Sequence, residues 1–269
     1  MESIKELKEI CQASKRNKPP KFSMAGYLLY RDISIYITKF FLLITNKKIN
    51  PNFISVLNII LIILGGLTLR HHSFRINILA FILIILSILL DKVDGELARY
   101  LKRDTLRGGL LEQVYHFVFM PSILTGLGLK LFFTYQDNIY LFLTLLVVVL
   151  IIFNTISSTF IYFMLFFKKI EWVRQYHNQE RKITPANRAL LKLLKILKFS
   201  TIIARNDLMI FMFLLVYVVD FFNSSHFLKW FFIIYITLVA IRFLRIVVTK
   251  YLNVDEDAQK IISKLYNSL

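Results

Sequence analysis

The sequence has one cysteine, few acidic residues and no apolar segment near its start. The single cysteine, Cys11, excludes an intramolecular disulfide bond. The first 20 residues are polar and rich in lysine, so they do not resemble a cleavable signal peptide. Lys and Arg number 34 against 17 Asp and Glu, a net charge of +17. These charges lie between long apolar runs, where they favour membrane lipid or a phosphate-bearing substrate as partner, and no nucleic acid.

The apolar runs are long enough to cross a bilayer, which takes about 20 residues as a helix. They predict an all-α integral membrane protein with six transmembrane helices. The expected spans are residues 53–69, 76–100, 110–133, 139–167, 202–222 and 227–250.

The segment before the first span predicts a helix of a different kind. Residues 27–45 are apolar but carry Arg31, Asp32 and Lys39, which is typical of an amphipathic helix lying in the membrane interface. Asn50-Pro51 ends this helix and begins the first span. A basic linker with a second amphipathic piece, residues 187–198, follows the fourth span. We expect a leader with the interfacial helix (1–50), a transmembrane domain (51–250) and a tail with a short surface helix (251–269).

The loop charges indicate the orientation in the membrane. Lys and Arg concentrate before the first span, between the second and third spans, and between the fourth and fifth. Ten of them lie within residues 1–50, whereas the other three loops are poor in them. Since basic loops stay in the cytoplasm, both termini and the end of the second span are expected there.

Ionisable residues gather where the second span ends and the third begins. Asp91 and Asp94 are three residues apart and share a helix face, and Glu112 and His116 are four apart and share another. A short turn joins the two helices, so these faces can meet. Because unpaired charges are costly at membrane depth, three carboxylates and one imidazole predict a divalent cation.

Small and basic residues border this cluster. Gly95, Ala98 and Gly108 lack side-chain bulk, which lets a ligand approach the backbone. Arg99 offers a guanidinium fork that suits phosphate. Two further charged residues of the second span, Lys92 and Glu96, are expected on its outer face.

The stretch from Asp91 to His116 resembles the motif of the CDP-alcohol phosphotransferase family. That motif is Asp, two residues, Asp-Gly, two residues, Ala-Arg, eight residues, Gly, three residues, Asp, three residues, Asp. The chain matches six positions at these spacings: Asp91, Asp94, Gly95, Ala98, Arg99 and Gly108. The last two positions hold Glu112 and His116 instead of Asp.

The resemblance implies an enzyme with its active site at the cytoplasmic face. An alcohol would attack a phosphorus of a CDP-linked donor, either CDP-diacylglycerol or a small CDP-alcohol, and release CMP. One or two Mg²⁺ or Mn²⁺ ions would be bound, and the protein would form a homodimer. The catalytic and metal-binding residues would be Asp91, Asp94, Glu112 and His116. The nucleotide site would be lined by Gly95, Ala98, Arg99, Gly108 and Asn52.

Several assignments stay open. His116 is a general base, a ligand that suits Mn²⁺ or Zn²⁺ better than Mg²⁺, or a sign of lost activity. Asn52, with Ser55 and Asn58, touches the nucleotide or belongs to a helix start. Arg205 and Arg242 bind the acceptor's phosphate, or they are structural or snorkelling arginines.

Two other classes of protein are alternatives to the enzyme. The rival is a catalytically inactive relative that serves as a membrane scaffold or as a lipid- or nucleotide-binding protein. A small transporter is disfavoured, because its polar groups would lie near the midplane of the membrane, on broken helices.

Overall fold

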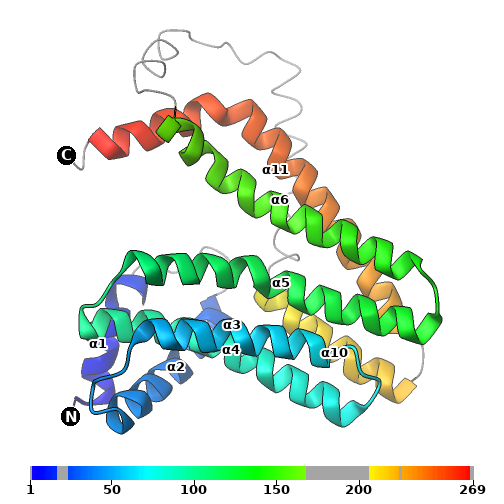
Figure 1. Ribbon diagram of the computed structural model, residues 1–269, viewed down its shortest axis with the longest axis horizontal. Helices are drawn as coiled ribbons and strands as arrows, with labels where there is room; N and C mark the ends of the chain where they lie inside the picture. Colours follow the sequence, from blue (N-terminus) through cyan, green and yellow to red (C-terminus); the bar gives the residue numbers. More distant parts are fainter. Residues whose placement is uncertain (1, 17–23, 168–205, 224–225, 267–269) are drawn as a thin grey trace. The chain divides into compact units, whose positions relative to one another are not determined.

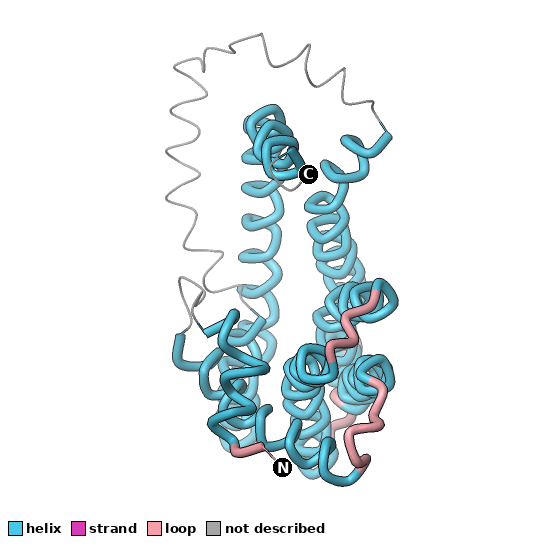
Figure 2. The backbone as a smooth tube through the Cα atoms, turned by 90° about the vertical axis from the view of Figure 1, so that its left-hand side faces the viewer, coloured by secondary structure: helices cyan, strands magenta, loops and turns pink. Residues whose placement is uncertain are grey.

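The computed structural model describes residues 2–16, 24–167, 206–223 and 226–266. In these ranges every regular element is a helix and none is a strand, as Figure 2 shows. The all-α fold class predicted from the sequence is therefore confirmed. The chain forms two compact units, residues 1–145 and 146–269.

The described ranges contain eight helices, labelled in Figure 1. Five lie in the first unit, two lie in the second, and α6 begins in the first and continues into the second. They are α1 (Ile4–Arg16), α2 (Met24–Ile44), α3 (Pro51–Thr68), α4 (Phe74–Leu101), α5 (Leu106–Tyr135), α6 (Ile139–Phe167), α10 (Asn206–Asn223) and α11 (Phe227–Tyr266).

Four of these helices are long and apolar enough to cross a membrane: α3, α4, α5 and the Phe227–Thr249 part of α11. Their outward faces carry many exposed large apolar side chains, which suits contact with lipid. The protein is therefore an integral membrane protein. Helices α6 and α10 stand where the fourth and fifth spans are expected, whereas the amphipathic piece at 187–198 lies outside the described residues.

The ends of α3, α4 and α5 follow local capping rules. The Asn50 side chain accepts a hydrogen bond from the Asn52 amide at 3.0 Å, and Pro51 occupies the first helical position. At the C-terminal end of α4, Lys102 adopts a left-handed conformation that ends the helix. The Thr105 hydroxyl then caps α5 by accepting from the Gly108 amide at 3.0 Å. The predicted short turn between the motif helices is thus confirmed as residues 102–105.

Helix α3 packs against both α4 and α5, and glycines set its distance from α5. A Cβ on Gly66 would lie 2.4 Å from the Ser122 carbonyl oxygen, and one on Gly126 would lie 1.9 Å from the Gly66 carbonyl oxygen. Close approach of two backbones through small residues is a common way to pack membrane helices. Only glycine permits this crossing.

Helices α1 and α2 pack on α4 and on each other. Ser3 and Glu6 form a capping box at the start of α1, with the Ser3 amide donating to Glu6 at 2.7 Å. The leader, expected to be only polar, therefore contains a docked helix. Its buried side joins an apolar core that consists of Leu7, Cys11, Ile35, Leu42, Ile49, Ile54, Leu90, Val93 and Leu97.

In the second unit, α10 packs against α11. Phe213, which is almost fully buried, stacks on Phe231 with ring centroids 6.1 Å apart. Helix α11 runs without a break from Phe227 to Tyr266. The tail expected as a separate surface helix is thus a continuation of the last span, because no proline or glycine interrupts the helix there.

Candidate functional site

A pocket of about 280 Å³ lies where α4 and α5 meet at their shared turn. This volume is slightly below the range of about 300–1,000 Å³ that is usual for small-molecule sites, so it suits a compact ligand or part of a larger one. The turn residues at its rim are exposed. The pocket is lined by Pro51, Asn52, Ser55, Asp94, Gly95, Ala98, Arg99, Arg103, Asp104, Thr105, Gly108, Gly109 and Glu112.

All five residues expected to line a nucleotide site line this pocket: Asn52, Gly95, Ala98, Arg99 and Gly108. A Cβ on Gly108 would lie 3.2 Å from the Asn52 side-chain oxygen, so the start of α3 closes the pocket beside α5. Nη1 of Arg99 lies 3.2 Å from the position that a Cβ would take on Gly95. The absence of side chains at these two glycines therefore leaves room beside a guanidinium and an amide.

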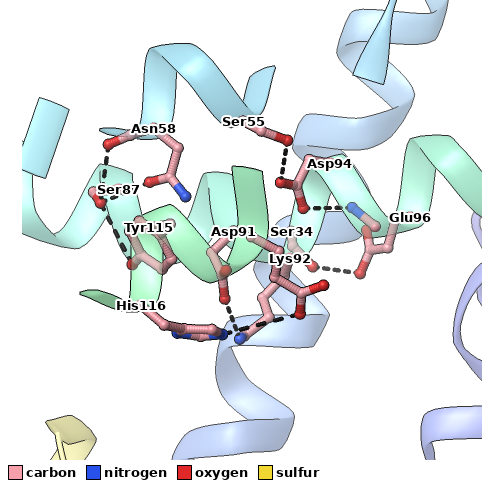
Figure 3. Close-up of polar contacts among 12 residues, drawn as sticks. Ser34, Ser55, Asn58, Ser87, Asp91, Lys92, Asp94, Glu96, Tyr115 and His116 are labelled. Carbon is pink, nitrogen blue, oxygen red and sulfur yellow. Dashed lines mark hydrogen bonds and ion pairs between the residues drawn. The ribbon is translucent and has the colours of Figure 1, made fainter. Parts of the chain in front are cut away.

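Asp94 is held from two sides (Figure 3). The Ser55 hydroxyl donates to one carboxylate oxygen at 2.7 Å, and the Gly95 amide donates to the other at 2.5 Å. Two donors fix the orientation of this half-buried carboxylate in the pocket wall. The sequence left the role of Ser55 open. The feature that could have indicated this role is a hydroxyl group one turn inside an apolar span.

The other ionisable residues of the motif form two pairs. Asp91 does not line the pocket, and its carboxylate accepts from Nζ of Lys92 at 2.5 Å. Nε2 of His116 lies 3.9 Å from a Glu112 oxygen, and both side chains are largely exposed. Among the described residues, no three His, Cys, Asp or Glu side chains come close enough to hold a metal ion. The structure thus brings the four predicted ligands to the same helix ends without gathering them around one point.

Asn58, one of the residues considered for the nucleotide, has another role. It is buried, does not line the pocket and accepts from the Ser87 hydroxyl at 2.7 Å. Ser87 also lies 3.5 Å from the Tyr115 hydroxyl. These three side chains link α3, α4 and α5, as Figure 3 shows.

The expectation that Glu96 lies on an outer face is wrong. Its side chain is fully buried, and its carboxylate accepts three hydrogen bonds of 2.7 Å each. The physical reason is that α1 and α2 cover the face of α4 opposite Asp94. The three donors are Gln12, Ser34 and Thr38.

A family model described as CDP-alcohol phosphatidyltransferase matches residues 48–205, more than half of the chain. The chain belongs to this family. The match begins just before α3 and includes every residue that lines the pocket. A comparison with curated proteins finds no match. The resemblance seen in the sequence is thus confirmed. The family that the chain belongs to is one of membrane phosphotransferases.

Neither of the two arginines expected near the acceptor is placed relative to the pocket, which belongs to the first unit. Arg205 falls outside the described residues, and Arg242 is half-buried on α11 in the second unit. By contrast, the turn residues Arg103, Asp104 and Thr105 line the pocket and had not been assigned to it. Their position in the sequence could have indicated this, because a turn that joins the two halves of the motif must pass the site.

Proposed function

We propose that the protein transfers a substituted phosphate group from a CDP-linked donor to an alcohol and releases CMP. The pocket between α4 and α5 carries this proposal, because the motif's small residues, an arginine and an oriented carboxylate line it together. Gly95, Ala98 and Gly108 would let the nucleotide approach the backbone. Arg99 and Arg103 would neutralise its phosphates.

The donor set suits a hard divalent cation in its chemistry, since Mg²⁺ and Mn²⁺ favour carboxylate oxygens. Asp91, Asp94 and Glu112 would hold one ion, and His116 would complete a second site. When bound, the cation supplies charge neutralisation of the diphosphate and polarises the phosphorus. Ser55 would keep the Asp94 carboxylate oriented for this role.

His116 is proposed to take the proton of the acceptor alcohol, with Glu112 one helical turn before it steadying the imidazole. The alcohol oxygen would form a bond to the phosphorus that carries the transferred group. The bond from that phosphorus to the oxygen of CMP would break, and CMP would leave with that electron pair. In the alternative role, His116 binds the metal ion.

The wider assignments are part of the same proposal. The donor is CDP-diacylglycerol or a small CDP-alcohol, and Arg205 and Arg242 contact the acceptor's phosphate. Residues 51–250 form the catalytic domain of a homodimer, and both termini and the pocket face the cytoplasm.

The test is CMP release by purified protein with each donor class, Mg²⁺ or Mn²⁺ and a panel of alcohols. We expect metal-dependent release by the wild type that is lost in Asp91→Ala. If high metal restores the activity of His116→Ala, the imidazole is a ligand; if high pH restores it, the imidazole is the base.

An inactive relative is the second candidate, favoured by the Lys92–Asp91 and His116–Glu112 pairs that occupy the carboxylates. Binding of CDP without CMP release from any donor would establish it.

The pairing of Lys92 with Asp91 leads to a prediction about metal affinity. We expect Lys92→Gln to tighten Mn²⁺ binding about fivefold, because an ammonium group on the carboxylate competes with the cation. Titration calorimetry on the detergent-solubilised protein would measure it. Lys102 is an exposed lysine at the end of the same helix, so Lys102→Gln controls for the change in net charge. Unchanged or weaker binding in Lys92→Gln alone would contradict the prediction.

A further inference from the structure

The N-terminal helix α1 contacts an arginine of the pocket. Nε of Arg99 donates to the carbonyl oxygen of Cys11 at 2.5 Å. Another nitrogen of the same guanidinium, Nη1, lies beside Gly95 in the pocket wall. A backbone carbonyl of α1 therefore anchors one edge of the guanidinium while the opposite end lies at the pocket.

The residue after Cys11 sets the position of that carbonyl. Gln12 is fully buried, and its Nε2 donates to Glu96 and to the Arg31 carbonyl, each at 2.7 Å. An amide nitrogen carries two hydrogens, so both are used. Because Glu96 lies three residues before Arg99 on one helix, the bond to Glu96 sets the register of Cys11 against Arg99.

Further contacts hold α1 on the last turns of α4. Leu7 and Cys11 of α1 are fully buried in the apolar core that α1 shares with α4. At the start of α1, Glu2 accepts from the Tyr100 hydroxyl at 2.6 Å and from Nζ of Lys47 at 3.0 Å. Contacts along α1 and just before it therefore reach the last turns of α4, which lead into the pocket rim.

The three donors on Glu96 differ in origin. Ser34 and Thr38 belong to α2, and only Gln12 comes from α1. A buried carboxylate needs such donors, since an unpaired one would be costly. Removing the bond from α1 should therefore loosen α1, while removing one from α2 should leave α1 in place.

We propose that α1 is part of the donor site: the Gln12–Glu96 bond holds the Cys11 carbonyl against Nε of Arg99 and so orients the guanidinium toward the donor's phosphate. Gln12 and Glu96 are positioning residues. The inference rests on the proposed function, in which Arg99 binds that phosphate.

The test compares two buried hydrogen bonds to the same carboxylate. Gln12→Met keeps the side-chain length but removes both donors, whereas Ser34→Ala removes one donor of α2. Because an oriented bond between guanidinium and phosphate depends on its anchor, we expect Gln12→Met to weaken CDP binding and raise KM for the donor about tenfold. kcat should stay within about twofold, and Ser34→Ala should change neither quantity by more than about twofold. Equal effects of the two variants would overturn the inference.

The single cysteine gives a second measurement that needs no variant. The side chain of Cys11 on α1 is fully buried in the core that includes α4 residues, so alkylation requires α1 to lift from α4. If α1 and the pocket are coupled, CDP must slow the alkylation of Cys11 in the wild type several-fold. A rate unaffected by saturating CDP, or a wild type that does not bind CDP, would overturn the inference. If CDP protects Cys11 from alkylation but no donor releases CMP, the proposed function is wrong and the coupling of α1 to the pocket still holds.

Discussion

Asp94→Asn is expected to lower CMP release by about 10²- to 10³-fold, a loss typical of removing one oriented electrostatic group from an active site. The carboxylate lies in the pocket wall, fixed by Ser55 and by the Gly95 amide. The substitution keeps the shape and leaves an oxygen to accept from Ser55, but it removes the negative charge that would hold a divalent cation. Initial rates of CMP release at saturating donor and metal would measure the loss.

A matched variant shows whether the loss comes from the pocket. Asp137 is exposed in the turn before α6 and caps the Ile139 amide at 2.9 Å, at the opposite end of α5 from the motif. Asp137→Asn keeps that cap and should keep the wild-type rate. Equal rates for the two variants would exclude Asp94 from the reaction.

Gly126→Ala is expected to produce the largest loss of stability, about 3 kcal/mol or more, at the upper end of the cost of overpacking. The new Cβ would lie 1.9 Å from the Gly66 carbonyl oxygen and 2.9 Å from its carbon. Backbone atoms of a packed helix cannot rotate away as a side chain can, so α3 and α5 must separate. Thermal unfolding in detergent and the size-exclusion profile would measure the effect.

Gly109→Ala is the control on the same helix. A Cβ at Gly109 would meet nothing within 4 Å. Alanine is a better helix former than glycine by about 1 kcal/mol, so this variant should be as stable as the wild type or slightly more stable. Because the two variants are expected to change the free energy of unfolding in opposite directions, they separate the effect of helix packing from that of helix propensity. A stable Gly126→Ala would show that α3 and α5 are less closely packed than described.

The helices and the turn of the motif could be predicted because they depend on local patterns. Apolar runs give α3, α4 and α5, and Asn50-Pro51 gives a capped start. The fixed spacing from Asp94 to Gly108 puts its small residues on facing helix ends. Gly95, Ala98, Arg99 and Gly108 therefore lie together in one pocket, which Asn52 at the start of α3 also lines.

Contacts between distant segments could not be predicted in this way. On α4, Glu96 lies opposite Asp94, and a charged residue there is ordinarily solvated. Its burial follows from the docking of α1, 84 residues earlier at Gln12. The capping box at Ser3 and Glu6 predicts that a helix starts, yet it does not say what the helix packs on.

The sequence by itself determined the membrane class, the family and five of the residues that line the pocket, because helix periodicity and motif spacing are local properties. Only the tertiary structure decided what those residues contact. Ser55 orients Asp94, Lys92 pairs with Asp91, and the Cys11 carbonyl anchors Arg99. Such pairings depend on which helix faces pack together, and a one-dimensional pattern shows that a face exists without showing its partner.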